Sequence, residues 1–212
     1  MLAETSTETY YYPNKMGWVI LRAMKNQLGE DRLKEVMRVA GMSTQMSTGF
    51  LPRTLDRRFS FETIAALQIA TEKVFGVKAG RYLNNRIGKG TFELGLKDFD
   101  AMLGIADLPM RLMPLGMKLR VGLDVFARMF NQNSDQIVKL SETDTHHLWI
   151  IERCPLCWKR KSDEPCCHLA GGLLEEAIFW GSAGRRFKVE EIACIAKGDA
   201  SCTFQLSKQP LE

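Results

Sequence analysis

Apolar residues recur at helical spacing along the first two-thirds of the chain. Over residues 16–28 they repeat every three or four positions, and Gly29 interrupts the pattern. Residues 33–40 repeat the pattern, which ends at Gly41. The spacing therefore predicts two helices before residue 42.

More helices are predicted before residue 106. Ser60 has the side chain of a helix N-cap, and apolar residues continue at helical spacing to Phe75. A further helix is expected within residues 77–87, and another over residues 96–105.

Residues 108–130 are apolar on nearly every side of a helix, with an interruption at Pro114. Gly116 and Gly122 weaken the prediction of one continuous helix. A helix that is apolar all round must be covered on both sides. This segment therefore predicts either a buried central or dimer-interface helix or one wall of an apolar ligand pocket. Methionine suits a pocket wall because its flexible thioether adapts to varied shapes.

After residue 135 the period changes from helical to alternating. Residues 136–140 and 148–151 predict two strands, and residues 187–196 and 201–206 two more. Between the pairs, a helix is expected with Asp163 as its cap, Pro165 in its first turn and Gly181 at its end. Helices followed by hairpins predict an α+β fold in a single domain, residues 1–212, with the sheet within residues 136–207.

Composition and charge exclude several classes of protein. A chain of 212 residues, 45% of them hydrophobic, can form one sizeable core. The net charge of +4 is dispersed, so no nucleic-acid-binding surface is expected. No apolar run is long enough to span a membrane, and the first residues lack the features of a secretory signal. A cytoplasmic protein is therefore expected.

All six cysteines lie between residues 154 and 202, and the preceding residues contain none. In a reducing compartment, clustered cysteines more often bind metal or carry redox chemistry than form structural disulfides. The crowding therefore predicts a bound metal or a redox switch.

A predicted hairpin brings two of these cysteines together. If residues 197–199 form its loop, with Gly198 or Asp199 left-handed, Cys194 faces Cys202. Opposed Cβ atoms about 4.5–5.5 Å apart suit two thiolates that bind one zinc at about 2.3 Å. Glu191, three residues before Cys194, points to the opposite face of a flat strand and joins this site only through a bulge or a strong twist.

Two other segments offer the remaining ligands. Cys166, Cys167 and His168 stand at the start of the predicted helix, where the helix N-terminus favours a thiolate. Cys154 and Cys157 have the two-residue gap of zinc knuckles and redox pairs. Alternatively, several of these cysteines are small buried hydrophobes.

The segment PCCHLAGGLLEEAIFWGSAGRRFKVEEIACIAKGDASCTF resembles the 4-vinyl reductase domain, also called a hydrocarbon-binding domain. The opening YYYPNKMGWVILRAMKNQLGEDRLKEVMRVAGM also resembles that family. The family includes aromatic-hydrocarbon sensor domains and proteins linked to bacteriochlorophyll synthesis. It shares a fold with Golgi-transport tethering subunits and is related to haem-based nitric-oxide sensors. The resemblance thus implies a ligand-binding fold of this type.

The resemblance also implies a structural zinc and its ligands. In this chain those positions are Cys167, Glu191, Cys194 and Cys202. Including Glu191 implies a bulge near Ile192. The chain departs from the family by its adjacent Cys166 and its extra pair Cys154 and Cys157, which together with His168 are alternative ligands. Whether Cys166 or Cys167 binds the metal stays open.

These features favour a binding domain, either a sensor or a carrier, for an apolar or aromatic small molecule. The pocket is expected between residues 108–130 and the strand that carries Trp149. Its expected lining is Met113, Met117, Phe126 and Trp149, with His147 as a polar anchor. The apolar helices and the resemblance predict a homodimer built on residues 1–42. Since no ATPase or DNA-binding module accompanies the domain, a sensor needs a separate output protein.

Two other functions are weighed against binding. One is reduction of a tetrapyrrole vinyl group, directly or as an accessory protein. No glycine-rich dinucleotide-binding motif follows a strand, and no Ser/His/Asp arrangement is evident, so no catalytic residue is assigned. The other is a redox switch or scaffold in which Cys154 and Cys157 form a reversible disulfide. The adjacent His146 and His147 are interpreted as a polar strand end rather than as haem ligands.

Overall fold

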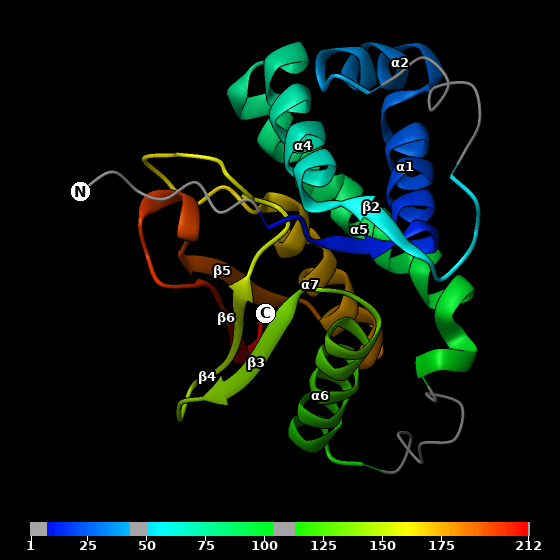
Figure 1. Cartoon of the computed structure of the whole chain (residues 1–212). Coiled ribbons are helices and arrows are strands. Elements are labelled where there is room, and N and C mark those ends of the chain that lie inside the picture. Colours follow the sequence, from blue (N-terminus) through cyan, green and yellow to red (C-terminus); the bar gives the residue numbers. More distant parts are fainter. Residues whose placement is uncertain (1–7, 43–50, 104–112, 212) are drawn as a thin grey trace.

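The fold, taken from a computed structural model that describes residues 8–42, 51–103 and 113–211, is α+β as predicted. Its helices are α1 (Asn14–Leu28), α2 (Glu30–Val39), α4 (Phe61–Phe75), α5 (Val77–Leu103), α6 (Leu115–Asn133) and α7 (His168–Gly181). In Figure 1, α1, α2 and α4 gather at one end, and the larger sheet and α6 lie at the other.

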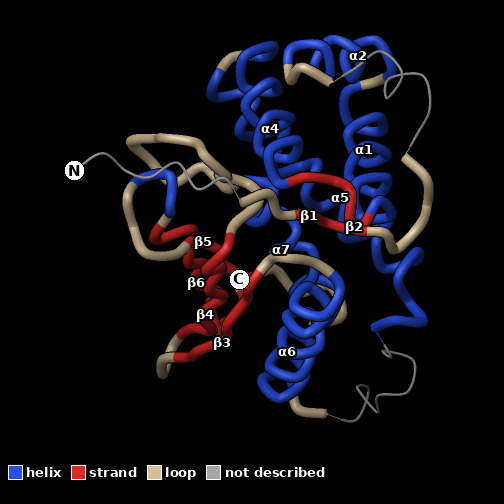
Figure 2. Tube along the Cα trace, in the orientation of Figure 1, coloured by secondary structure: helices blue, strands red, loops and turns tan. Residues whose placement is uncertain are grey.

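Four antiparallel strands form the larger sheet, in the order β3 (Ile137–Glu142), β4 (His146–Arg153), β6 (Cys202–Pro210) and β5 (Phe187–Ala193). Helix α7 packs between β5 and α5, and α5 also packs against α1 (Figures 1 and 2). A small sheet that the sequence did not predict pairs β1 (Tyr11–Pro13) with β2 (Arg57–Ser60). The core therefore lies between the helical layer and one face of the larger sheet.

Local sequence signals account for several helix ends. Gly29 ends α1 with a positive φ of 79°, a backbone conformation that glycine adopts without strain. The Ser60 hydroxyl caps α4 by accepting a hydrogen bond from the Thr63 N–H at 3.2 Å, as predicted. The apolar face of α1 is buried within the chain, with Val19 and Ala23 fully covered.

The two helices predicted at residues 77–87 and 96–105 are wrong, because α5 runs without interruption from Val77 to Leu103. Its central Gly88 permits close packing rather than ending the helix. A Cβ at Gly88 would lie 2.1 Å from the carbonyl oxygen of Leu169, and a Cβ at Gly172 would lie 1.8 Å from that of Asn85. Helices α5 and α7 therefore approach backbone to backbone.

Helix α6 differs from the expectation of a helix covered on both sides. Pro114 is its N-cap, and its buried side chains, among them Leu123 and Phe126, share one face. Met117 on the other face is 55% exposed. The prediction therefore holds for one side only, and its residues 108–112 lie outside the described part of the chain.

The prediction for the start of α7 is also wrong. Cys167 is the N-cap, and Asp163 and Pro165 precede the helix in an extended loop. The extended loop lets Cys166 and Cys167 both approach Cys194. Among the described residues, no helix combines the length and apolar character needed to cross a membrane.

Candidate metal centre

All six cysteines collect in one buried cluster of free thiols. They come from four segments that are distant in sequence. Cys154 and Cys157 lie in the loop after β4, Cys166 and Cys167 lie at the start of α7, Cys194 follows β5, and Cys202 begins β6. The cluster therefore ties the sheet to α7.

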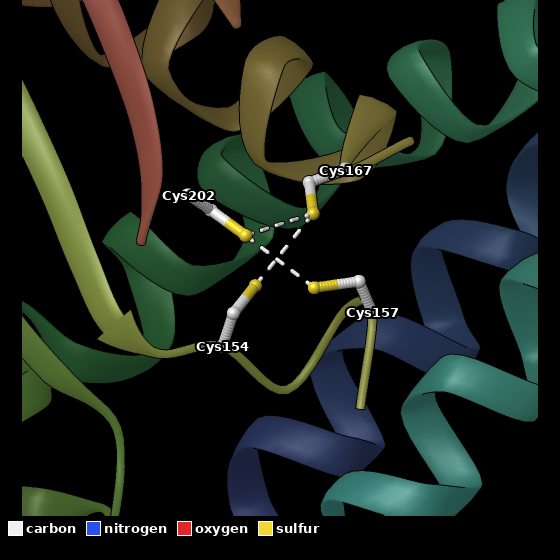
Figure 3. Close-up of side chains that lie close together, drawn as sticks. All are labelled: Cys154, Cys157, Cys167 and Cys202. Carbon is white, nitrogen blue, oxygen red and sulfur yellow. Dashed lines mark hydrogen bonds between the residues drawn. The ribbon is translucent and has the colours of Figure 1, made fainter. Parts of the chain in front are cut away.

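Four of the sulfur atoms point toward a common centre (Figure 3). The Sγ of Cys167 lies 3.6 Å from that of Cys154 and 3.7 Å from that of Cys202. The Sγ of Cys157 lies 3.4 Å from that of Cys202. All four sulfurs are within 4.8 Å of one another. Tetrahedral zinc with bonds of about 2.3 Å separates its sulfur ligands by about 3.8 Å, so this spacing suits one zinc.

A second group consists of Cys167, Glu191, Cys194 and Cys202, whose ligand atoms also lie within 4.8 Å of one another. The Sγ of Cys194 is 3.9 Å from those of both Cys167 and Cys202. This is the ligand set that the family resemblance implies, and the structure brings its members together. The two groups have Cys167 and Cys202 in common.

A bulge in β5 turns Glu191 toward the cysteines. Glu191 pairs with Phe204, whereas Ala193 pairs with the adjacent Thr203, so Ile192 is the extra residue. Ile192 is correspondingly exposed. The bulge near Ile192 is confirmed, and it removes the conflict between strand alternation and the position of Glu191.

The Glu191 carboxylate is only partly satisfied. Its Oε2 accepts a hydrogen bond from the backbone N–H of Cys167 at 2.8 Å. Its buried Oε1 has no hydrogen-bond partner within the described ranges. Burial, and secondarily the nearby Cys194, raises the pKa of Glu191 to about 9. A buried carboxylate oxygen without a partner, beside several thiols, fits a zinc ligand.

Backbone groups hold the hairpin end of the cluster. The Cys194 N–H donates to Asp199 Oδ2 at 2.8 Å, and the Ile195 N–H donates to the Cys202 Sγ at 3.3 Å. A short 3-10 helix, η3 (Ile195–Lys197), and a left-handed Gly198 close the turn. The left-handed Gly198 is confirmed. The predicted three-residue loop is wrong, because β5 already ends at Ala193 and the connection is longer.

Cys166 and His168 stand beside the cluster. The Cys166 Sγ is 3.8 Å from that of Cys194, but Cys166 belongs to neither four-ligand group. His168 also belongs to neither group, and its buried Nε2 has no hydrogen-bond partner in the described residues. The structure thus brings Cys167, rather than Cys166, into both groups.

Two small apolar cavities lie between the helices and the sheet. One of about 30 Å³ is bounded by β4 through Trp149 and Ile151. The other, of about 20 Å³, reaches α6 at Phe126. Both are lined by Met16, Thr91, Phe130 and Leu173. The cavities are therefore neighbours separated by shared side chains.

The expected pocket residues are divided among different places. Trp149 lines the larger cavity and Phe126 the smaller one. His147 lines a separate open groove of about 400 Å³ beside Arg120 and Glu142. Met113 is half-buried and Met117 is exposed, and neither lines these spaces. Sequence reasoning missed the contributions of α1, α5 and α7, which no spacing pattern marks.

His147 is a buried histidine at the edge of that groove. Its Nδ1 lies 3.7 Å from Glu142 Oε2, and its buried Nε2 has no hydrogen-bond partner in the described part of the chain. Burial, followed by the charge of Lys208, lowers the pKa of His147, while Glu142 opposes the shift. The neutral imidazole is therefore favoured in the folded protein.

Comparison with known proteins identifies one family and one fold. Residues 149–208 match the family model of the 4-vinyl reductase domain, the resemblance expected from the tail of the sequence. No curated protein matches the chain significantly.

The solved structures that match include H-NOX domains. An H-NOX protein from S. oneidensis in the Fe(II) ligation state has a TM-score of 0.60 and 10% identity, over 94% of this chain and 98% of that chain. The Fe(II) unliganded H-NOX protein from K. algicida has a TM-score of 0.53 and 14% identity, over 94% and 97%. An oxygen-binding H-NOX domain related to soluble guanylate cyclases gives 0.52 and 14%, over 92% and 94%. The chain therefore has the nitric-oxide-signalling type of fold that was predicted.

Modulation of haem redox potential is the subject of another structure with this fold, which raises the question of a haem site. Haem iron is commonly held by histidine or cysteine. Neither residue type lines the two cavities, whose volumes of about 30 and 20 Å³ are far too small for a porphyrin. His147 faces the open groove, and His168 lies at the start of α7. The described residues do not fit a haem.

Proposed function

We propose that this chain is a sensor or carrier domain that binds an apolar or aromatic small molecule between its helical layer and β4. The pair of adjoining apolar cavities carries the proposal. They are walled mainly by aliphatic and aromatic side chains, with Thr91 and Gln136 as polar groups. Binding sites of this composition take apolar ligands and use few polar groups to orient them.

The cavities must merge or expand to admit such a ligand. A cavity of roughly 150 Å³ holds benzene, whereas the larger one here has about 30 Å³. Met16 and Leu173 line both cavities, and side chains of this kind can change rotamer to join them. Ligand binding would then shift the packing of α1 and α7, which gives a sensor its conformational signal.

The same proposal includes a structural zinc bound by Cys167, Glu191, Cys194 and Cys202. A zinc ion with four protein ligands has no open position for water, so it contributes folding energy rather than catalysis. Here it would fasten the N-terminus of α7 to the hairpin of β5 and β6. The next residues of α7, Leu169 and Ala170, line the larger cavity, so the zinc would also position one wall of the ligand site.

Toluene titration of zinc-loaded protein, followed by calorimetry or NMR, tests the binding function. Thr91→Met places a longer side chain where the two cavities meet and should abolish toluene binding. Met117→Trp is the matched control, because Met117 is exposed on α6 and its enlargement should leave binding unchanged. Equal toluene binding by wild type and Thr91→Met would contradict the proposed site.

Native mass spectrometry of protein isolated from its own cells addresses the natural ligand. A co-purifying apolar compound that Thr91→Met fails to retain would identify the ligand class. The homodimer on residues 1–42 and the separate output protein stay predictions. The apolar face of α1, which motivated the dimer, packs within the chain, so light scattering of the purified protein is the required test.

A further inference from the structure

Cys154 and Cys157 have no role in the proposed zinc site, although both lie against it. They are 1% and 2% exposed. Each contacts one ligand of that site: Cys154 lies next to Cys167 and Cys157 next to Cys202. Two further buried thiols in contact with a metal site need either a disulfide or a metal of their own to be more than packing.

The sulfur geometry favours a metal over a disulfide. Cys154 and Cys157 are free, and the shortest contact of each is to a cysteine of the proposed zinc site rather than to its partner in the CxxC pair. These contacts, at 3.6 and 3.4 Å, are close to the edge of about 3.8 Å that tetrahedral zinc imposes on its sulfur ligands. The four sulfurs thus form a second tetrahedral set.

The two sets share one edge, the pair Cys167 and Cys202, whose sulfurs are 3.7 Å apart. A thiolate sulfur has more than one lone pair and can therefore bridge two metal ions. From this geometry we infer that the chain holds a binuclear centre, with two divalent ions of the zinc type bridged by Cys167 and Cys202. Cys154 and Cys157 complete the first ion, and Cys194 and Glu191 complete the second.

The charge of such a centre is moderate for a buried site. Its five thiolates and one carboxylate carry six negative charges, and two divalent ions offset four of them. The remaining charge equals that of one zinc bound to four thiolates, which is a common structural site. With only one ion, the two spare thiols would stay protonated in the core without a ligand role.

The first ion would act on the apolar cavity. Leu156, between Cys154 and Cys157, lines the larger cavity, and its carbonyl oxygen accepts a hydrogen bond from Gln68 at 2.8 Å. Ile151 pairs with Cys202 across β4 and β6 and lines the same cavity. The first ion therefore fixes a wall that the second ion does not reach. This inference rests on the proposed zinc set only for its second ion.

Metal content per folded chain, measured by elemental analysis and native mass spectrometry, tests the inference. The wild-type protein should carry two zinc ions. Cys154→Ser with Cys157→Ser should carry one, and Glu191→Gln with Cys194→Ser should also carry one. Cys166→Ser is the matched control, because Cys166 touches Cys194 but belongs to neither set, and it should keep two ions.

Other results overturn specific parts. A single ion in the wild type that survives the Cys154 and Cys157 changes leaves the proposed zinc site and removes the binuclear centre. A single ion lost with those changes but kept in the Glu191 and Cys194 variant removes both the binuclear centre and the proposed zinc set. Loss of an ion in Cys166→Ser overturns Glu191 as a ligand. Iron with acid-labile sulfide, or a disulfide between Cys154 and Cys157 in reduced preparations, overturns the binuclear centre outright.

Cadmium substitution gives a readout that does not depend on variants folding. Cadmium replaces zinc at thiolate sites, and its NMR-active isotope reports each ion separately. The wild type should give two cadmium signals, one typical of four sulfur ligands and one of three sulfurs and an oxygen, with a coupling carried through the shared thiolates. Two uncoupled signals, or one signal, would contradict bridging.

Discussion

The Sγ atoms of Cys167 and Cys202 lie 3.7 Å apart and belong to both groups of candidate metal ligands. Cys167 caps α7, and Cys202 begins β6. Their contact therefore joins the helix that walls the apolar cavities to the central part of the sheet. Stability and ligand binding are both expected to depend on this junction.

Removal of metal should strongly destabilise the protein. Ligands of a structural zinc site contribute folding free energy directly, so Cys202→Ser should lose metal and unfold at a lower temperature. The expected loss is at least several kcal/mol, since structural zinc binds with about 10–16 kcal/mol in small domains. Thermal unfolding with and without a chelator measures it. An unchanged melting temperature of the wild type in chelator, after confirmed metal removal, would contradict a structural role.

Enlarging the shared wall of the cavities should strengthen toluene binding while weakening the fold. Leu173 is buried and lines both cavities, so Leu173→Ala should cost about 2–5 kcal/mol of unfolding free energy. The new space should also raise toluene affinity, because less rearrangement is needed. Met117→Ala, on the exposed side of α6, should change stability by less than about 0.5 kcal/mol. Unchanged or weaker toluene binding by folded Leu173→Ala would argue against the cavities as the site.

The close crossing of α5 and α7 should not tolerate a methyl group. A Cβ at Gly88 would lie 2.1 Å from the Leu169 carbonyl oxygen, so Gly88→Ala should cost about 1–3 kcal/mol or more despite the better helix propensity of alanine. Gly116→Ala in α6 meets nothing within 4 Å and should be neutral or slightly stabilising. Urea unfolding of both variants gives the comparison. Stabilisation by Gly88→Ala would show that the helices are not in backbone contact.

Acid should destabilise the fold in part through His147. Its pKa is lowered in the folded protein, so the unfolded chain binds more protons at a pH just below the ordinary histidine value of about 6.5. The free energy of unfolding therefore rises with pH through that range and levels off above it. His147→Gln should reduce this slope between about pH 5 and 7. Unfolding curves at matched zinc content measure the difference, and parallel curves for the two proteins would refute it.

Local signals in the sequence predicted the elements that depend on local chemistry. The positive φ at Gly29, the cap at Ser60 and the left-handed Gly198 all follow from the residue type itself. The continuity of α5 could not be predicted, because Gly88 usually weakens a helix and only its packing on α7 explains it. The family resemblance, not periodicity, predicted the bulge that turns Glu191 toward the cysteines.

The candidate sites show the same division. The crowding of cysteines predicted a metal, and the hairpin brought Cys194 near Cys202 as expected. That the CxxC pair shares two ligands with the other set depends on how the loop after β4 folds back, which spacing does not encode. The cavity walls from α1, α5 and α7 likewise arise from tertiary packing, whereas the surface position of Met117 shows how a helix's apolar content can mislead.

The proposals for stability and for ligand binding both require that the buried cysteine cluster is a metal centre. X-ray absorption at the zinc edge, on protein purified without added metal, is the sharpest test of that requirement. We expect stoichiometric zinc with a first shell dominated by sulfur at about 2.3 Å and a minor oxygen contribution. Protein that folds stably without metal, or zinc surrounded only by nitrogen and oxygen, would contradict it.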